Sequence, residues 1–591
     1  MAFAPRCFLI LALLTVRPGF AGPARVFRQW IAGQEAGGSS EQESGDGRDQ
    51  LMESHEWNHL ERMGTVIQQD LKQQARKLPD GSMSFSWTLT MSQEPMTGEG
   101  SWSPREPGKL KLTFGSGSPR TLDVPPGAVL WPGDQDDALK AAARAVKAVS
   151  VQGFSFPTQQ WTSTTLKPVG PEPLPGFPDT VHFRGRSAEG SLVEEVDLWI
   201  SPVQGEVKHL GTIAGIPFLS QRSELPPPAV QDGGSSLFQR TIKALPPHPF
   251  LLWLPQVRVR WSGTQPQELR EDAQQRRLGP GSFRLVRAQP PSAREALDPP
   301  VTGRPSPEDA PFLAATPLVQ FRDPVFDGLE RRLNPPRNAT RWELAQRVTS
   351  FVYDWIREKN YTVGFATAQE VARNPQGACA QHGVLAVALL RRLGVPARGV
   401  TGWMAFGETL GLHFWVEARI AGRWIPLDPT FDEAPASAYR LKLGTTDLAD
   451  LGGVGPGSPD ANFLDGVWVP AGPWTADVRP QGDTVFAPGG LTLRVPGSRW
   501  QLADGRLALV WDGSHPVEAV PHPAPAEQAH SRRLQGPGGG RRGWWQSGGQ
   551  LTIDLGAGRW LRVGGLSETQ AFQLLAALEA EDHAQPAANA A

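Results

Sequence analysis

Cysteine is almost absent from this sequence. The 591 residues contain two, Cys7 and Cys379, and Cys7 falls in a segment that we expect to be removed. The mature chain then has a single thiol and no internal disulfide. Because an unpaired thiol is a liability in an oxidising compartment, the lone Cys379 indicates a residue that the protein uses.

Long runs of one charge and long apolar runs are also missing. The formal net charge is −2 and the sequence pI is about 6.6, so nucleic acid is not an expected partner. The apolar run Cys7–Val16 falls well short of the ~20 residues that span a bilayer. Arg6 precedes this run, and Gly19–Ala21 supplies small residues for cleavage. These features predict a signal peptide at 1–21 and an exported protein, periplasmic or extracellular, with no transmembrane span in the mature chain.

Glycine (64 residues) and proline (57 residues) are abundant, and they separate patterned segments into several expected domains. Alternation of apolar and polar residues, as in Met83–Met91, predicts a mainly antiparallel β domain over 22–225, with one helix at Asp137–Val149. Three further units are predicted: a small β unit at 237–290, an α+β domain at 311–450, and a C-terminal β domain at 485–582 with a terminal helix.

The segment around Cys379 is the best-patterned part of the chain. Thr340–Glu343 is a capping box that opens one helix. Apolar residues recur at a helical period over Val384–Leu393, and Gly394 followed by a proline ends this second helix. Cys379 therefore begins a helix. Unpaired N–H groups and the positive end of the helix dipole favour a thiolate there, so we expect a lowered cysteine pKa and a nucleophilic thiol.

A thiol nucleophile needs a base, and the base needs a group that holds its tautomer. His413 lies on one predicted strand, and Asp428 ends the next. Ala421-Gly422 predicts a hairpin turn between these strands, which brings the imidazole and the carboxylate to the same end. A cysteine at a helix start, a histidine on a strand and an aspartate on the adjoining strand can support acyl transfer. This chemistry needs no metal and no organic cofactor.

Four segments resemble the transglutaminase-like superfamily, as found in bacterial exported cysteine enzymes. They are Gly377–Cys379, Leu393–Arg398, His413–Glu417 and Trp424–Thr430, preceded by Thr316–Leu318 and Asp323-Pro324. The resemblance covers the central domain only. It implies a papain-like α+β core, which the mainly antiparallel β domains predicted from the patterning would flank. It also implies that Cys379 is the nucleophile, His413 the general base and Asp428 its orienting acid, with a thioester intermediate.

Other readings of single motifs stay open. His382 follows Cys379 by one helical turn and is a rival base. His55–His59 fits the pattern H-E-x-x-H, which on a helix would bind zinc, although no convincing third ligand follows. Gln376 and Gln381 are candidate second donors to an oxyanion, beside the backbone N–H of Cys379.

Two functions from different classes follow. The first is an exported thiol peptidase or amidase that acts on a protein or peptide, with hydrolysis preferred over protein cross-linking. The alternative is a catalytically degenerate scaffold that binds cell-envelope proteins or glycans. Rapid alkylation of Cys379 would favour the enzyme.

Overall fold

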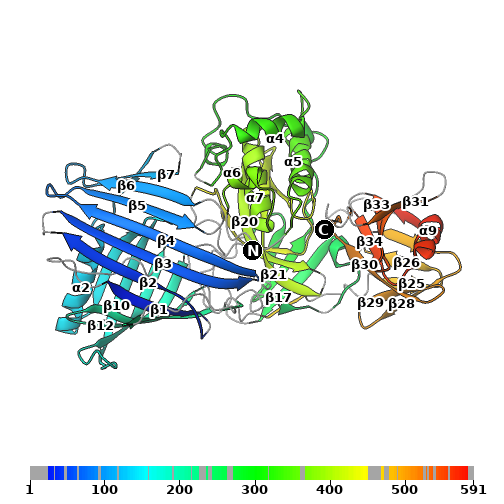
Figure 1. Cartoon of the computed structure of the whole chain (residues 1–591). Coiled ribbons are helices and arrows are strands. Elements are labelled where there is room, and N and C mark those ends of the chain that lie inside the picture. Colours follow the sequence, from blue (N-terminus) through cyan, green and yellow to red (C-terminus); the bar gives the residue numbers. More distant parts are fainter. Residues whose placement is uncertain are drawn as a thin grey trace.

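The computed structural model shows three parts side by side: a large N-terminal sheet, a central part with helices, and C-terminal sheets (Figure 1). The structure describes residues 24–582 except 32, 46–48, 63–64, 91–94, 116–118, 158, 190–191, 214–215, 225–234, 237–242, 246, 263–270, 317, 360–365, 407, 450–466, 471–477, 489, 524–527, 529–530, 537–540 and 557–558. The predicted signal peptide at 1–21 lies outside the described residues. Within the described ranges, no helix is both long enough and apolar enough to cross a membrane.

The N-terminal part is a mainly antiparallel sheet in which most neighbouring strands are consecutive in sequence. Its first strand, β1 (Arg25–Ile31), pairs with both β2 (Gln34–Gly45) and β14 (Ile216–Ser223), which joins the two halves of the sheet. The other strands are β3 (Gln50–Arg62), β4 (Thr65–Lys77), β5 (Met83–Thr90), β6 (Met96–Trp102), β7 (Lys109–Phe114), β8 (Arg120–Asp123), β9 (Val149–Ser155), β10 (Gln160–Pro171), β11 (Val181–Glu189), β12 (Leu192–Ser201) and β13 (Gly205–Ile213). A short strand, β15 (Ser235–Ser236), runs parallel to β3.

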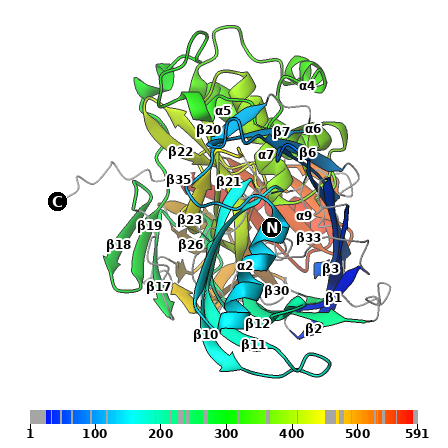
Figure 2. The same ribbon diagram turned by 90° about the vertical axis from the view of Figure 1, so that its left-hand side faces the viewer.

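Two local predictions for this part can be checked. In β5 the apolar residues are buried and the Ser and Thr residues between them are more exposed, which confirms the predicted half-buried strand. The predicted helix is α2 (Pro132–Ala145), which begins and ends earlier than Asp137–Val149 because Pro132 occupies its first turn and Val146 is left-handed. Figure 2 shows α2 enclosed by the curved sheet, with β1–β3 on one side and β10–β12 on the other.

The central part combines four helices with a five-stranded sheet. The helices are α4 (Val325–Leu333), α5 (Arg341–Trp355), α6 (Ala368–Arg373) and α7 (Cys379–Arg392). The strands are β16 (Lys243–Ala244), β20 (Ala397–Phe406), β21 (Thr409–Ile420), β22 (Arg423–Leu427) and β23 (Arg440–Thr446). The capping box at Thr340 is present, and Ala421 and Gly422 both have positive φ in the hairpin turn between β21 and β22. Both predictions are confirmed.

The remaining strands form three smaller antiparallel sheets. One contains β17 (Gln256–Ser262), β18 (Gln275–Gly279), β19 (Ser282–Val286) and β24 (Val467–Pro470). The second contains β25 (Arg479–Gln481), β26 (Thr484–Ala487), β27 (Leu491–Arg494) and β35 (Glu579–Asp582). The third contains β28 (Arg499–Ala503), β29 (Arg506–Val510), β30 (Ser514–Val520), β31 (Arg532–Gln535), β32 (Arg542–Gln546), β33 (Gln550–Gly556) and β34 (Arg559–Val563). The terminal helix is α9 (Glu568–Ala577), and short 3₁₀ turns lie at Leu251–Trp253, Glu295–Leu297 and Ala310–Phe312.

Hydrophobic cores connect the parts. One buried cluster contains Phe85 of the N-terminal sheet together with Val348 of α5 and Leu385 of α7. A second cluster joins Ile31 of β1 to Trp403 of β20. The described chain is thus mainly antiparallel β, with its helices gathered in the centre, and the central part is packed against the sheets around it.

Candidate active site

Cys379 is the first residue of α7, as predicted. Its side chain is 5% exposed, and it is the free cysteine within the described residues. The N–H groups of a first helical turn have no acceptor inside the helix, and the helix dipole is positive at this end. The start of α7 therefore stabilises negative charge at this position.

Close packing of α7 on β21 brings the cysteine to the strand that carries His413. Gly383 lies one turn after Cys379, and a Cβ added there would be 2.4 Å from the ring of Phe414 in β21. A Cβ added at Gly399 of β20 would also be 2.4 Å from this ring. The two glycines leave the space that the Phe414 ring fills, which sets the distance between the helix and the sheet.

His413 lies in β21 opposite Gly402 of β20 and is almost completely buried. Its Nε2 is 2.7 Å from Oδ2 of Asp428, and its side chain is also hydrogen bonded to that of Cys379. Because Asp428 occupies Nε2, Nδ1 is the nitrogen left for the thiol. The structure therefore brings the three predicted residues together in the order cysteine, histidine, aspartate.

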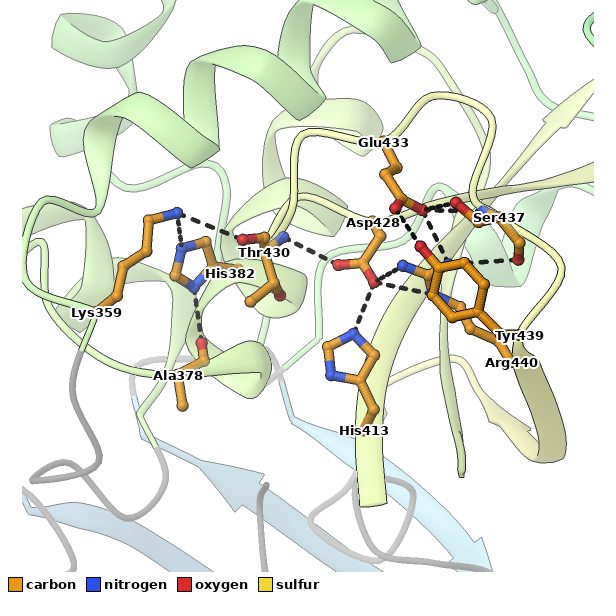
Figure 3. A network of polar contacts seen from close by, with 10 residues as sticks. All are labelled: Lys359, Ala378, His382, His413, Asp428, Thr430, Glu433, Ser437, Tyr439 and Arg440. Atoms are coloured by element: carbon orange, nitrogen blue, oxygen red, sulfur yellow. Dashed lines mark hydrogen bonds and ion pairs between the residues drawn. The ribbon is translucent and has the colours of Figure 1, made fainter. Parts of the chain in front are cut away.

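Asp428 directly follows β22, at the start of a tight turn. Backbone hydrogen bonds of 2.8 and 3.0 Å between Asp428 and Glu433 close this turn. Inside the turn, the Thr430 N–H donates to Oδ1 of Asp428 at 3.0 Å. The carboxylate is fully buried, and its Oδ2 is aimed at His413 (Figure 3).

Arg440 completes the site and was missed by sequence reasoning. This first residue of β23 donates to Oδ2 of Asp428 from Nε at 3.0 Å and from Nη2 at 2.7 Å. Its Nη1 lies 2.9 Å from Oε2 of Glu433. Glu433 in turn accepts hydrogen bonds from Ser437 and from the Tyr439 hydroxyl. The sequence shows only an arginine directly before the alternating residues Leu441–Leu443, and nothing in this local pattern pairs the arginine with Asp428.

The charges of this group shift its pKa values in a consistent way. Burial opposes the charged form of His413, but the Asp428 charge and hydrogen bonds to Asp428 and Cys379 together raise the pKa of His413 above its ordinary value. Burial would raise the pKa of Asp428, but the charges of His413 and Arg440 outweigh it and hold that pKa well below its usual range. The ionised Asp428 therefore stabilises a positive charge on His413.

His382 is engaged away from the thiol. Its Nδ1 is 2.7 Å from the Ala378 carbonyl oxygen, and its Nε2 is 3.3 Å from Nζ of Lys359. Burial and the Lys359 charge lower the pKa of His382 to about 3. With both ring nitrogens occupied, His382 has no nitrogen to offer Cys379, so it is not the base that the sequence left open.

The H-E-x-x-H segment is not on a helix. His55–His59 lies within β3, where residues four apart are separated by ~13 Å, too far for two ligands of one zinc ion. His55 Nε2 instead contacts Asp70 of the neighbouring strand at 2.6 Å. In the ranges that the structure describes, no group of three or more His, Cys, Asp and Glu side chains is placed to hold a metal ion.

The two glutamines proposed as oxyanion donors differ in their surroundings. Gln381 Oε1 accepts a hydrogen bond from the Ala378 N–H at 2.9 Å, so this buried side chain caps the start of α7. Gln376 lies before the helix, where its backbone N–H donates to the Asn374 carbonyl at 2.8 Å. A second oxyanion donor from either residue stays a prediction.

Comparison with protein families agrees with the central part of the chain. Residues 328–429 match the family model described as the transglutaminase-like superfamily. The matched range contains Cys379, His413 and Asp428. This region is therefore a transglutaminase-like core, as the four sequence segments predicted. No curated protein matches the chain.

Three solved structures share a partial likeness. A β-barrel-like protein from Brucella abortus is 12% identical, covers 36% of this chain and 99% of its own, and has a TM-score of 0.29. A "putative cysteine protease" from Cytophaga hutchinsonii is 15% identical, covers 36% of this chain and 81% of its own, and has a TM-score of 0.23. A "putative protease" from Parabacteroides distasonis is 10% identical, covers 83% of this chain and 90% of its own, and has a TM-score of 0.14. TM-scores this low assign no activity.

Proposed function

We propose that the central part is a thiol enzyme that cleaves peptide or carboxamide bonds, with Cys379 as nucleophile, His413 as general base and Asp428 as its orienting acid. The observation that carries the proposal is the buried, hydrogen-bonded row of these three side chains, in which the pKa of His413 is raised and that of Asp428 is lowered. Arg440 acts as a positioning residue because it fixes the carboxylate that orients the imidazole.

The proposed reaction has two steps. The Cys379 thiolate attacks the carbonyl carbon, and His413 donates its proton to the leaving amine, which gives a thioester and a free amine. His413 then takes a proton from water, and the resulting hydroxide attacks the thioester, releasing a carboxylic acid and restoring the thiolate–imidazolium pair. The N–H of Cys379 is the first donor expected to stabilise the oxyanion in both steps.

Water is the proposed acceptor because an amine acceptor would need a second binding site. The substrate is a protein or peptide, and the basic and apolar segment before Ala21 supports action outside the cytoplasm, on material of the cell envelope. Release of free amine without incorporation of an added primary amine, such as a fluorescent cadaverine, is the expected result. Incorporation into protein would instead favour cross-linking.

Alkylation tests the nucleophile directly. At pH ~6 an ordinary thiol is almost fully protonated, whereas a thiolate paired with His413 reacts quickly. At this pH we expect iodoacetamide to alkylate native Cys379 faster than it alkylates the thiol of glutathione. In the His413→Ala variant, Cys379 should react no faster than glutathione. Slower or equal modification of the native protein would favour the scaffold over the enzyme.

A further inference from the structure

A chain of polar contacts beside the three proposed catalytic residues has no part in the reaction described so far. His382 is fully buried between the Ala378 carbonyl oxygen, 2.7 Å from Nδ1, and the Lys359 ammonium, 3.3 Å from Nε2 (Figure 3). A protonated lysine can only donate, so Nε2 is the acceptor. The proton of the neutral ring must then lie on Nδ1, where it is donated to the Ala378 carbonyl.

The Ala378 carbonyl belongs to the same peptide unit as the Cys379 N–H. A trans peptide is planar, and its C=O and N–H point in opposite directions. Any group that fixes the carbonyl therefore also fixes the direction of the N–H. That N–H is the first in α7, and it is the expected oxyanion donor.

The chain just before the cysteine is held from its other side as well. Gln381 accepts the Ala378 N–H at 2.9 Å. Gly377 makes room for this contact, because a Cβ added there would lie 2.5 Å from Cγ of Gln381, and its φ of +132° disfavours other residues. Two buried side chains from the first turn of α7 thus hold the backbone from Gly377 to Cys379, in addition to the His382 N–H that donates to the Ala378 carbonyl at 3.2 Å. The Nδ1 contact adds a second direction to the hold on this carbonyl.

Lys359 connects this arrangement to the acidic end of the site. Its Nζ lies 3.3 Å from the centroid of the Tyr353 ring and 3.4 Å from the Thr430 carbonyl oxygen. The N–H of the same Thr430 donates to Oδ1 of Asp428 at 3.0 Å. Lys359 therefore spans from the histidine that orients the helix start to the turn that holds the carboxylate.

We propose that His382, kept in its Nδ1–H tautomer by Lys359, is a positioning residue that aims the Cys379 N–H at the oxyanion. This inference rests on the proposed thiol enzyme and adds to it the device that orders its oxyanion donor. Loss of a whole oxyanion donor costs about 10²–10³ in rate, so a misdirected N–H should cost about 10–100-fold. The loss should fall on kcat rather than KM, because the oxyanion forms only as the carbonyl reacts.

Two reactions of the same thiol separate positioning from general damage. Iodoacetamide reacts by displacement of iodide and forms no oxyanion, whereas acylation by p-nitrophenyl acetate passes through a tetrahedral oxyanion. In His382→Leu we expect alkylation at pH ~6 to stay within about twofold of the native rate while acylation falls about 10–100-fold. In His382→Asn the amide nitrogen can take the place of Nδ1, so acylation should return to within about threefold.

Lys359 provides a second variant at a half-buried position that tolerates substitution better. Lys359→Met should lower acylation about 3–10-fold without changing alkylation, because the ring is then free to adopt the other tautomer. Arg357→Met, at an exposed position two residues earlier, is the matched control and should leave both rates unchanged.

The outcomes that overturn the inference are distinct from failure of the proposed function. If the rates of alkylation and acylation fell equally in His382→Leu, or if that variant were acylated at the native rate, His382 would not direct the Cys379 N–H. A native protein that alkylates slowly and is not acylated would overturn the thiol enzyme itself, and this inference with it.

Discussion

Replacing Asp428 by asparagine removes the negative charge beside His413 while it keeps the size of the side chain. In the native protein burial lowers the pKa of His413, but the Asp428 charge, the hydrogen bonds to Asp428 and Cys379 and the Cys379 charge together raise it above its ordinary value. Without that charge, burial dominates and the pKa of His413 falls. The imidazolium is then less stable, so the thiolate that it pairs with forms only at higher pH.

The size of the effect follows from the contacts. Asp428 is fully buried and shares its Oδ2 between His413 Nε2 at 2.7 Å and two nitrogens of Arg440 at 3.0 and 2.7 Å. A tenfold loss of thiolate at a given pH corresponds to about 1.4 kcal/mol of lost charge stabilisation. Loss of the correct tautomer adds to this in acyl turnover, which should fall about 10²–10⁴-fold. Arg440 keeps Glu433 at 2.9 Å, so the variant should still fold.

The assay is the rate of Cys379 alkylation by iodoacetamide between pH 4 and 9, read by intact mass. We expect the acid limb of the profile to move to higher pH and the rate at pH ~6 to fall at least about tenfold. Asp432→Asn is the matched control, because Asp432 lies in the same turn but bonds Ser350 at 2.6 Å, and asparagine tolerates its positive φ. A profile for Asp428→Asn that overlays the native one would refute the charge coupling described here.

Three further predictions concern packing, pH and metal. Gly383→Ala should lower the free energy of unfolding by about 1–3 kcal/mol in a denaturant titration, because its methyl group overlaps the Phe414 ring. The control Gly328→Ala in α4 meets nothing within 4 Å and should be neutral or slightly stabilising. Equal free energies of unfolding for the two variants would contradict the packing. Because the pKa of Asp428 is lower in the folded protein than its unfolded value of about 3.9, ionised Asp428 stabilises the fold above that pH, and this stabilisation is lost as the pH falls through the folded pKa. The free energy of unfolding of the native protein should therefore fall more steeply below pH ~4 than that of Asp428→Asn. Parallel curves for the two proteins would contradict this coupling. His55→Ala should have the same zinc content as the native protein when both are measured by atomic emission. Stoichiometric zinc in the native protein that is absent from His55→Ala would contradict the strand geometry of β3.

The proposed catalytic residues could be found from the sequence because local signals position them. A helix start indicates Cys379, and a hairpin turn between two strands places His413 near Asp428. The packing of α7 on β21 then brings Cys379 to them. Each signal acts over a few residues, and the resemblance to a known family supplied the order of the segments.

Features that depend on distant packing could not be found in this way. Arg440 reaches Asp428 only because β23 pairs with β20 in the folded sheet, and no local pattern encodes that pairing. The contact of His382 with Lys359 likewise joins α7 to residues that precede α6. The segment His55–His59 fits a metal-binding pattern only if it is helical, and pairing of β3 with β2 and β4 decides against that. Local propensity is a weak guide where sheet partners determine the backbone.

The central claim is that Cys379 forms a thioester during turnover. The most direct test is to incubate the protein with a cell-envelope peptide extract, quench in acid and measure the intact mass, with Cys379→Ala as control. We expect an added acyl mass on the native protein that hydroxylamine removes and that the variant never acquires. A native protein that stays unmodified under conditions in which substrate is consumed, or a Cys379→Ala variant that consumes it equally fast, would contradict the account.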